Sequence, residues 1–402
     1  MYDFDRITPR RGSGSYKWDA RPPFGTDMDR VIPLWVADMD FPAAPCILDA
    51  LRRRVEHGIF GYTQVPDSYY DAVIRWFGRR HGWTVRRDWI IYTSGVVPAL
   101  SAVIKALTVP GDKVIVQTPV YNCFFSSIRN NGCEIADCPL VQDGKTWRFD
   151  YEGLERRCAD PDAKILLLCN PHNPAGRVWT KEELARVGDI ARRHGIVVVS
   201  DEIHCEIVMP GFRYTPFALA AGDRGCITLC SPSKSFNTAG LQIANIITDN
   251  ADWRERIDRA ININEVCDVN PFGVTALEAA YSEEGENWLN ELNAYIHGNY
   301  NCLKERLSEW PVSELEGTYL AWIDCRRLGL GAEAIEEELL REEDVWVNAG
   351  TMYGTEGFIR INLACPRATL REGLDRVARG LERLARQDGP SPRTAPAKKD
   401  EI

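Results

Sequence analysis

The chain has 402 residues, of which 45% are hydrophobic and 10% aromatic, and this composition is ordinary for a globular protein with a large domain and a smaller one. Its 48 basic and 58 acidic residues give a formal net charge of −10, which argues against a general binder of nucleic acid or of anionic membranes. The first residues lack the basic and apolar blocks of a signal peptide, and no apolar run approaches the roughly 18 residues of a membrane span, so we expect a cytoplasmic protein.

The N-terminal part predicts an arm followed by two helices. Residues 1 to about 45 are rich in Gly, Pro, Arg and Asp and contain one short apolar strand candidate, Val31–Val36. Pro45–Glu56 has the pattern of a helix, because proline is well placed at its start and Gly58 follows its end. A second helix is predicted for Ser68–Arg80, where apolar residues recur at helical spacing.

From Ile90 onward strands and helices alternate, which is the pattern of a parallel sheet covered on both faces. Several of the strands are nearly continuous apolar runs, typical of strands that are buried on both sides. The predicted strands are 90–92, 113–117, 165–169, 196–200, 226–230 and 243–248, and the predicted helices are 97–107, 181–194 and one that starts at Trp253. In open sheets of this kind, ligands bind beyond the carboxyl ends of the strands.

The remainder of the chain predicts a long helical stretch over 271–306 and then a second, smaller α/β unit. The strands of this unit are predicted at 319–323, 345–348 and 358–363, and its helices at 333–341 and 369–386. We expect both chain ends to share the small domain, and the proline-containing, charged tail to be disordered. The expected regions are an N-terminal arm with part of the small domain (1–50), a large domain (51–290), a small C-terminal domain (291–386) and a disordered tail (387–402).

Thirteen cysteines are present, without any Cys-x-x-Cys pair. In a reducing compartment such residues are usually small buried hydrophobes. The one local cluster of metal-capable side chains is His204, Cys205 and Glu206, but neighbours in sequence point in different directions. We therefore expect no metal site.

Polar and aromatic side chains follow several of the predicted strands. Gly95 lies in a turn that opens a helix, whose free N–H groups and positive dipole end could hold a phosphate. Tyr121 follows the next strand and could stack on a planar cofactor, although a tyrosine in such a place is more often a packed edge residue. Asn170 and Asn173 lie in the turn Asn170–Gly176 after the third strand. Their amides face the same crevice as the other motifs.

Asp201 and Lys234 end two strands that are consecutive in the chain. A carboxylate at the end of an apolar strand is costly unless it is paired, so Asp201 requires a cation, for which a protonated pyridine nitrogen would serve. Burial disfavours the charged form of a lysine, so Lys234 could be a neutral amine that forms a Schiff base with an aldehyde cofactor, with Ser231 and Ser233 as donors to its phosphate. The alternative is that Lys234 lies in a loop and simply reaches water. The cofactor site is favoured because the other motifs are expected at the same edge of the sheet.

Three segments together resemble those of fold-type I pyridoxal 5'-phosphate (PLP) enzymes of the class I/II aminotransferase superfamily. They are 170–176, 201–204 and 231–237. Further segments resemble the MalY/PatB branch, the cystathionine β-lyase or C–S lyase group. They are 35–41, 60–62, 231–242 and 359–367. The resemblance covers most of residues 30 to 380. It implies the aspartate aminotransferase fold, with a mainly parallel seven-stranded sheet in the large, PLP-binding domain, and a homodimer with shared active sites.

The resemblance also implies roles for individual residues. Lys234 would form the Schiff base, Asp201 would keep the pyridine nitrogen protonated, Tyr121 would stack on the ring, and these three are the expected catalytic residues. The phosphate is expected to be held by Gly95, Val96, Val97, Ser231 and Ser233, joined by Tyr62 of the other subunit.

Substrate contacts are implied in the same way. Arg360 would bind the substrate carboxylate, and Asn173, which also hydrogen-bonds the phenolic oxygen of the ring, would lie beside the substrate with Tyr62, Trp35 and Asp38. For His204, expected at the cofactor, a packing role and a catalytic role both remain open.

The branch resemblance predicts α,β-elimination from L-cystathionine or cysteine S-conjugates, which yields pyruvate, ammonia and a thiol. Transamination is the first alternative, because it uses the same lysine, aspartate and arginine. A regulatory or binding protein that keeps PLP is an alternative of another class. The side chain of the substrate is not fixed by these residues.

Overall fold

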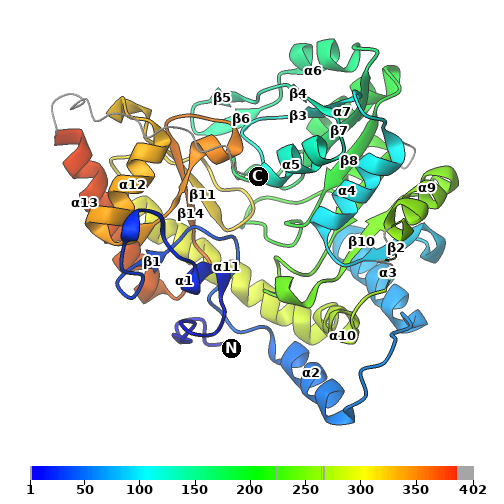
Figure 1. Ribbon diagram of the computed structural model, residues 1–402, viewed down its shortest axis with the longest axis horizontal. Coiled ribbons are helices and arrows are strands. Elements are labelled where there is room, and N and C mark those ends of the chain that lie inside the picture. Colours follow the sequence, from blue (N-terminus) through cyan, green and yellow to red (C-terminus); the bar gives the residue numbers. More distant parts are fainter. Residues whose placement is uncertain (1, 223–224, 264, 266–267, 387–402) are drawn as a thin grey trace.

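The computed structural model describes residues 2–222, 225–263, 265 and 268–386, and its centre is a seven-stranded sheet with the order β2-β10-β9-β8-β7-β3-β4 (Figure 1). In this sheet β10 runs antiparallel to both neighbours and the other pairs are parallel, so six strands end on the same edge. The α/β class and the mainly parallel seven-stranded sheet are confirmed. The strands are β2 (Ile90–Thr93), β3 (Lys113–Val116), β4 (Glu134–Asp137), β7 (Ala163–Cys169), β8 (Val197–Asp201), β9 (Cys226–Cys230) and β10 (Ala244–Ile247).

Helices cover both faces of this sheet, as the alternating pattern predicted (Figure 1). Along β7, Ile165 and Leu167 belong to the core that also contains side chains of α4, α5 and α9, whereas Leu166 and Leu168 belong to the core that contains those of α6, α7 and α8. The bounds of these helices are α4 (Val96–Leu107), α5 (Asn122–Asn130), α6 (Tyr151–Cys158), α7 (Lys181–Arg193), α8 (Phe217–Ala221) and α9 (Ala251–Asn262).

The helical stretch predicted over 271–306 is present and consists of two helices, α10 (Pro271–Ala280) and α11 (Glu283–Arg306). Ser282 separates them: its hydroxyl accepts a hydrogen bond from the Gly285 N–H at 3.1 Å and so caps the start of α11. The predicted helices near the N-terminus are present as α2 (Pro45–His57) and α3 (Asp67–His81).

The smaller unit has an antiparallel sheet with the order β11-β14-β13, formed by β11 (Leu320–Asp324), β14 (Phe358–Asn362) and β13 (Asn348–Ala349). The strand predicted over 345–348 is wrong as one strand, because β12 (Val345–Trp346) pairs instead with β1 (Ile32–Pro33). This pairing joins the N-terminal segment to the C-terminal part of the chain. The helices beside these sheets are α12 (Ala332–Glu343) and α13 (Arg367–Arg386).

The remaining elements are short. They are α1 (Tyr16–Asp19), the hairpin β5 (Val141–Asp143) and β6 (Thr146–Arg148), and the 3-10 turns η1 (Pro23–Gly25), η2 (Arg87–Trp89), η3 (Ala239–Leu241), η4 (Arg326–Leu328) and η5 (Gly350–Tyr353). The tail 387–402, for which disorder was predicted, lies outside the described residues. The bounds of the four expected regions stay a prediction.

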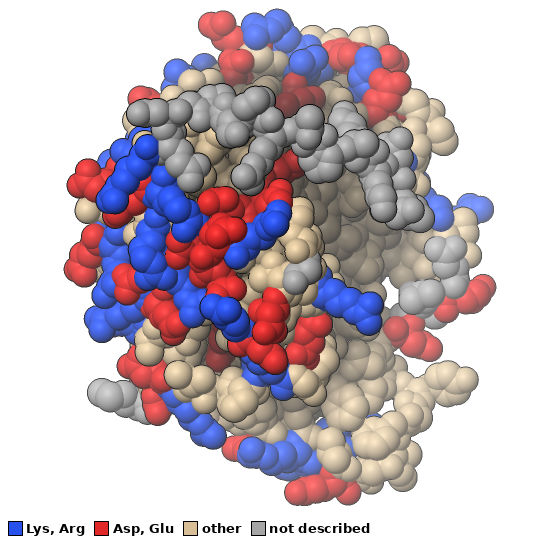
Figure 2. Space-filling model, turned by 60° about the vertical axis from the view of Figure 1, so that its left-hand side comes forward, with Lys and Arg blue, Asp and Glu red and all other residues tan. Residues whose placement is uncertain are grey.

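Acidic and basic side chains alternate over the face formed by α12 and α13 (Figure 2). Arg379 pairs with Glu343, and Arg383 pairs with Glu343 and Glu338, so opposite charges lie next to one another on this face. Within the described part of the chain, the cysteines are free thiols and most are buried, as predicted. No helix among the described residues has the length and hydropathy needed to cross a lipid bilayer.

Candidate active site

Lys234 lies in the loop after β9, and its amine is buried at the edge of the sheet where the parallel strands end. The Nζ atom donates a hydrogen bond to the carbonyl oxygen of Ala37 at 2.7 Å. Burial, and then the positive charge of Arg360, lower the pKa of Lys234 to about 8, while the negative charges of Asp38 and Asp201 oppose this shift. A larger fraction of this amine than of an ordinary lysine amine is therefore neutral and nucleophilic near neutral pH.

Asp201 ends β8, the strand next to β9, and its side chain is buried. Burial raises the pKa of this carboxyl to about 7, although the N–H of Ile203, which donates to its Oδ1 at 3.1 Å, and the charge of Lys234 favour the ionised form. Among the described residues no cation lies within ion-pair distance of Asp201. A positively charged ligand atom beside this carboxyl would restore its charge.

A cavity of about 280 Å³ lies between these two side chains and the start of α4. Eight of the residues predicted from the sequence line it: Val96, Val97, Tyr121, Asn173, Asp201, His204, Ser233 and Lys234. A larger groove of about 460 Å³, lined among others by Met209 and Trp310, contains none of them, so volume alone would have pointed away from the titratable groups. The chemistry-bearing side chains mark the smaller cavity as the site.

The start of α4 faces this cavity through Val96 and Val97. Gly95 is the residue before the helix, and no side chain caps the free N–H groups of its first turn. These donors and the positive end of the helix dipole suit an anion such as a phosphate. The Ser231 hydroxyl, in contrast, donates to the carbonyl of Ile243 at 2.6 Å and accepts from the N–H of Ser233, so it braces the lysine loop.

Arg360 is a buried cation on β14. Its Nη1 donates to the Asn173 Oδ1 at 3.2 Å, its Nη2 donates to the carbonyl of Trp35 at 2.7 Å, and its Nε has no hydrogen-bond partner among the described residues. The ring of Tyr353 lies 4.8 Å from the guanidinium carbon. A guanidinium with a free donor beside the cavity is suited to bind a carboxylate.

His204 is buried at the cavity, and its Nδ1 has no hydrogen-bond partner in the described structure. Burial and the positive charges of Lys234 and Arg360 hold its pKa well below the usual range, so the ring is neutral. Burial also raises the pKa of Tyr121, whose hydroxyl therefore stays protonated. A neutral imidazole and a phenol are available to hydrogen-bond or stack on a ligand.

The prediction that the amide of Asn170 faces this cavity is wrong, because it donates instead to Glu202 at 3.3 Å and to the carbonyl of Thr215 at 3.1 Å.

Three further predicted residues lie elsewhere. Trp35 contributes its backbone carbonyl to Arg360, and its ring stacks on Trp346 with centroids 4.0 Å apart. Asp38 pairs with Arg10 of the N-terminal arm at 2.6 Å. Tyr62 is fully exposed and does not line this cavity of its own chain.

Two contacts of the site were not predicted. The Ala37 carbonyl accepts from Lys234, and no sequence pattern marks a backbone atom for such a role. The hydroxyl of Tyr319 donates to the same carbonyl at 3.0 Å, and its position just before β11 gave no signal beyond a buried aromatic residue.

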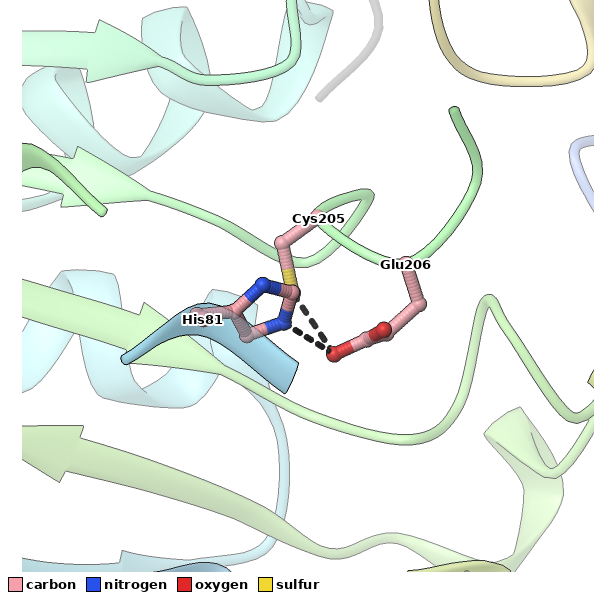
Figure 3. Close-up of side chains that lie close together, drawn as sticks. All are labelled: His81, Cys205 and Glu206. Atoms are coloured by element: carbon pink, nitrogen blue, oxygen red, sulfur yellow. Dashed lines mark hydrogen bonds and ion pairs between the residues drawn. The ribbon is translucent and has the colours of Figure 1, made fainter. Parts of the chain in front are cut away.

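A second cluster of titratable side chains lies outside the cavity. The potential ligand atoms of His81, Cys205 and Glu206 lie within 4.8 Å of one another (Figure 3). The histidine of this cluster is therefore His81 of α3, and not His204, which the sequence analysis had grouped with Cys205 and Glu206. The Glu206 carboxylate accepts from His81 at 2.7 Å, from Arg80 at 2.7 Å and from Trp76 at 2.6 Å. His81 and Arg80 outweigh the effect of burial and hold the pKa of Glu206 at about 2, so these contacts account for the buried charge without an ion.

The family model for class I and II aminotransferases matches residues 29–377. The chain belongs to this family. It is 40% identical over 387 residues to the cystathionine β-lyase PatB of Bacillus subtilis, covering 94% of this chain and 100% of that protein. It is 34% identical to the protein MalY of Escherichia coli, covering 93% and 97%. The crystal structure of cystalysin from Treponema denticola, which contains a pyridoxal 5'-phosphate cofactor, superposes with a TM-score of 0.91 at 37% identity, covering 96% and 100%.

Proposed function

We propose that the protein is a PLP-dependent carbon–sulfur β-lyase that acts on L-cystathionine or a cysteine S-conjugate. The observation that carries the proposal is the meeting of Lys234 and Asp201 in one cavity, at the ends of neighbouring strands, with Arg360 beside it. Relatives of this family that are named cystathionine β-lyase, and a C–S lyase from Staphylococcus hominis with PLP bound, support the reaction class.

The residues of the cavity fit PLP. Lys234 offers the aldehyde an amine whose lowered pKa favours the neutral form, and Asp201 offers the pyridine nitrogen a carboxyl that needs a cation. The unpartnered Nδ1 of His204 and the amide of Asn173 are available to the phenolic oxygen, and Tyr121 is available to the ring face. The N–H groups at the start of α4 suit the phosphate.

PLP supplies an electron sink for the electrons left when a proton is removed from the substrate Cα. The protein supplies the proton carrier, because the amine of Lys234 can take the Cα proton once a substrate amine has displaced it. Arg360 holds the substrate carboxylate and so fixes the orientation of the Cα–H bond. As this proton leaves, the Cβ–S bond breaks, the sulfur departs with the bonding electrons as a thiolate, and water converts the remaining enamine to pyruvate and ammonia.

The test is product analysis with purified, PLP-loaded protein and L-cystathionine. The proposal predicts pyruvate, ammonia and homocysteine in equal amounts without any added keto acid. Strict dependence on a keto acid would overturn it in favour of an aminotransferase. The variant Lys234→Ala is the matched control, because it removes the amine that carries the proton and should release no pyruvate.

We further propose that the protein is a cytoplasmic homodimer whose subunits share their active sites. The support is the end of α2 and the segment that follows it, which expose Val55, Ile59, Phe60 and Tyr62. Large apolar side chains gathered on a surface mark an interaction site. Tyr62 is thereby free to reach the phosphate site of a partner.

Mixing tests this assembly. Tyr62→Ala and Lys234→Ala are each expected to be weak or inactive alone, but a mixed dimer would hold one site with both an intact Lys234 and a partner's intact Tyr62. Random exchange of subunits should recover about a quarter of the wild-type activity. No recovery, in a mixture shown to exchange subunits, would contradict shared sites.

A further inference from the structure

Two cations near the start of the N-terminal arm bind two carboxylates further along it, beside the active site. Arg10 pairs with Asp38 at 2.6 Å and with Asp40 at 2.6 Å, and Lys17 pairs with Asp40 at 2.8 Å and lies 3.8 Å from Asp38. The indole N–H of Trp18 also donates to Asp40 at 2.8 Å. These five side chains, here called the arm clamp, contain two positive and two negative charges and so balance.

The arm clamp is largely removed from water. The side chain of Lys17 is 0% exposed and that of Asp40 is 5% exposed. Buried charges of this kind persist only when they are paired and hydrogen-bonded, and loss of one partner leaves the other uncompensated. The arm is therefore firmly attached to the segment that carries Asp38 and Asp40.

That segment is also the one that contacts Lys234. Between Trp35 and Asp40, the Ala37 carbonyl accepts from the Lys234 amine at 2.7 Å and from the Tyr319 hydroxyl at 3.0 Å. Arg10 additionally donates to the carbonyl of Met39 at 3.0 Å, so the arm holds backbone as well as side chains. Asn362 donates to the carbonyl of Asp38 at 2.6 Å from the other side.

We propose that Arg10 and Lys17 are positioning residues for Lys234: by binding Asp38 and Asp40 they fix the Ala37 carbonyl as the acceptor on which the free Lys234 amine rests. The inference rests on the proposed function, because the position of this amine matters when it carries the substrate proton. A lysine amine is a point charge on a flexible four-carbon stem, so a fixed acceptor decides where it waits.

Two amides of the segment report on the clamp in cofactor-free protein. The N–H of Met39 donates to Asn237 at 3.0 Å and the N–H of Asp40 donates to the carbonyl of Ala364 at 2.9 Å, so both should be protected from hydrogen exchange. Arg10→Gln removes one cation at a site that is 21% exposed, where folding should tolerate it. We expect exchange of these two amides to become at least about tenfold faster.

Arg11→Gln is the matched control. Arg11 lies in the same arm and donates to the carbonyl of Val31 at 2.8 Å. Its guanidinium lies over the ring of Trp18, 5.1 Å from the centroid, but among the described residues it pairs with neither Asp38 nor Asp40. We expect its amide exchange to stay within about twofold of the wild type. Arg10→Lys keeps the charge and should restore most of the protection.

Kinetics of the PLP-loaded enzyme link the clamp to the amine. Arg10→Gln should lower kcat at least about fivefold with KM within about threefold, because Lys234 acts on substrate that is already bound. Arg10→Lys should recover most of kcat, and Arg11→Gln should match the wild type. Should Arg10→Gln fail to fold, Asp38→Asn removes a charge that Arg10 binds, keeps the side-chain shape and has the same expected result in hydrogen exchange. Its kcat also reflects the loss of a charge that raises the pKa of Lys234, so exchange is the deciding measurement for this variant.

Two results would overturn the positioning role. In the first, hydrogen exchange in Arg10→Gln is as slow as in Arg11→Gln. In the second, Arg10→Gln speeds hydrogen exchange but leaves kcat unchanged. A wild-type enzyme that releases no pyruvate would instead overturn the proposed function, whatever the exchange data show.

Discussion

Replacing Asp201 by asparagine should stabilise the cofactor-free protein above pH 7 and at the same time abolish elimination. Burial raises the pKa of this carboxyl from 3.8 to about 7 in the folded protein. Below pH 3.8 the carboxyl is protonated in the folded and unfolded states alike, and it then costs nothing. As the pH rises toward 7, the unfolded chain gains a charge that the folded protein resists, so stability is lost.

The magnitude follows from the difference between the two pKa values. At about 1.4 kcal/mol per pH unit, raising the pKa from 3.8 to about 7 costs at most about 4 kcal/mol of folding free energy above pH 7. Asparagine has the same shape, can still accept from the Ile203 N–H and carries no charge. We expect Asp201→Asn to be more stable than the wild type by about 1 to 4 kcal/mol at pH 8, and by much less at pH 5.

Urea unfolding of cofactor-free protein at pH 5 and pH 8 measures this difference. Asp71→Asn, at a side chain that is 60% exposed, is the control and should change little at either pH. With PLP bound, the asparagine offers no charge to the pyridine nitrogen, so pyruvate release should fall at least about a hundredfold. Equal stability of Asp201→Asn and wild type at both pH values, or a loss at pH 8, would refute the reasoning.

Three further outcomes are expected. Arg360→Lys should raise KM for the amino-acid substrate at least about tenfold in steady-state assays, because an ammonium group cannot replace the planar set of donors of a guanidinium. An unchanged KM would count against binding of the substrate carboxylate by Arg360. The rate of acetylation of Lys234 in cofactor-free protein can be measured by peptide mass at a series of pH values. Its midpoint should lie near the pKa of about 8, and a midpoint near the usual 10.5 would contradict the burial argument. Glu206→Gln should lower the free energy of unfolding at pH 7 by about 3 kcal/mol, because it leaves Arg80 and His81 without their buried carboxylate. A loss below about 1 kcal/mol would show that these ion pairs contribute little to stability.

The central sheet was predictable because its strands are short apolar runs bounded by turn residues, and their alternation with helices fixes a parallel arrangement. The edge strand Glu134–Asp137 was missed, since its partly exposed sequence has no such run. The break between α10 and α11 depends on one capping bond at Ser282, and the helical pattern continues across it. The segment 345–348 contributes to two different sheets, which only long-range pairing decides.

At the site, Asp201 and Lys234 were found because a charged residue at the end of a buried strand or in the loop after it is costly unless it is paired, which indicates a ligand. The Ala37 carbonyl could not be found in this way, because a backbone atom leaves no trace in the residue type. The His81–Glu206 pair joins residues far apart in the sequence, so local proximity suggested His204 instead. The part of Ser231 in phosphate binding stays a prediction, since its hydroxyl is engaged with Ile243.

The most direct measurement of the central claim is reductive trapping of the cofactor. The protein is loaded with PLP, which should give a visible absorption band at roughly 420 nm, and is then reduced with borohydride and digested for peptide mass analysis. The account predicts that the band disappears and that one phosphopyridoxyl group is attached to Lys234, with none in Lys234→Ala. Attachment to another lysine, or no attachment at all in protein saturated with PLP, would contradict it.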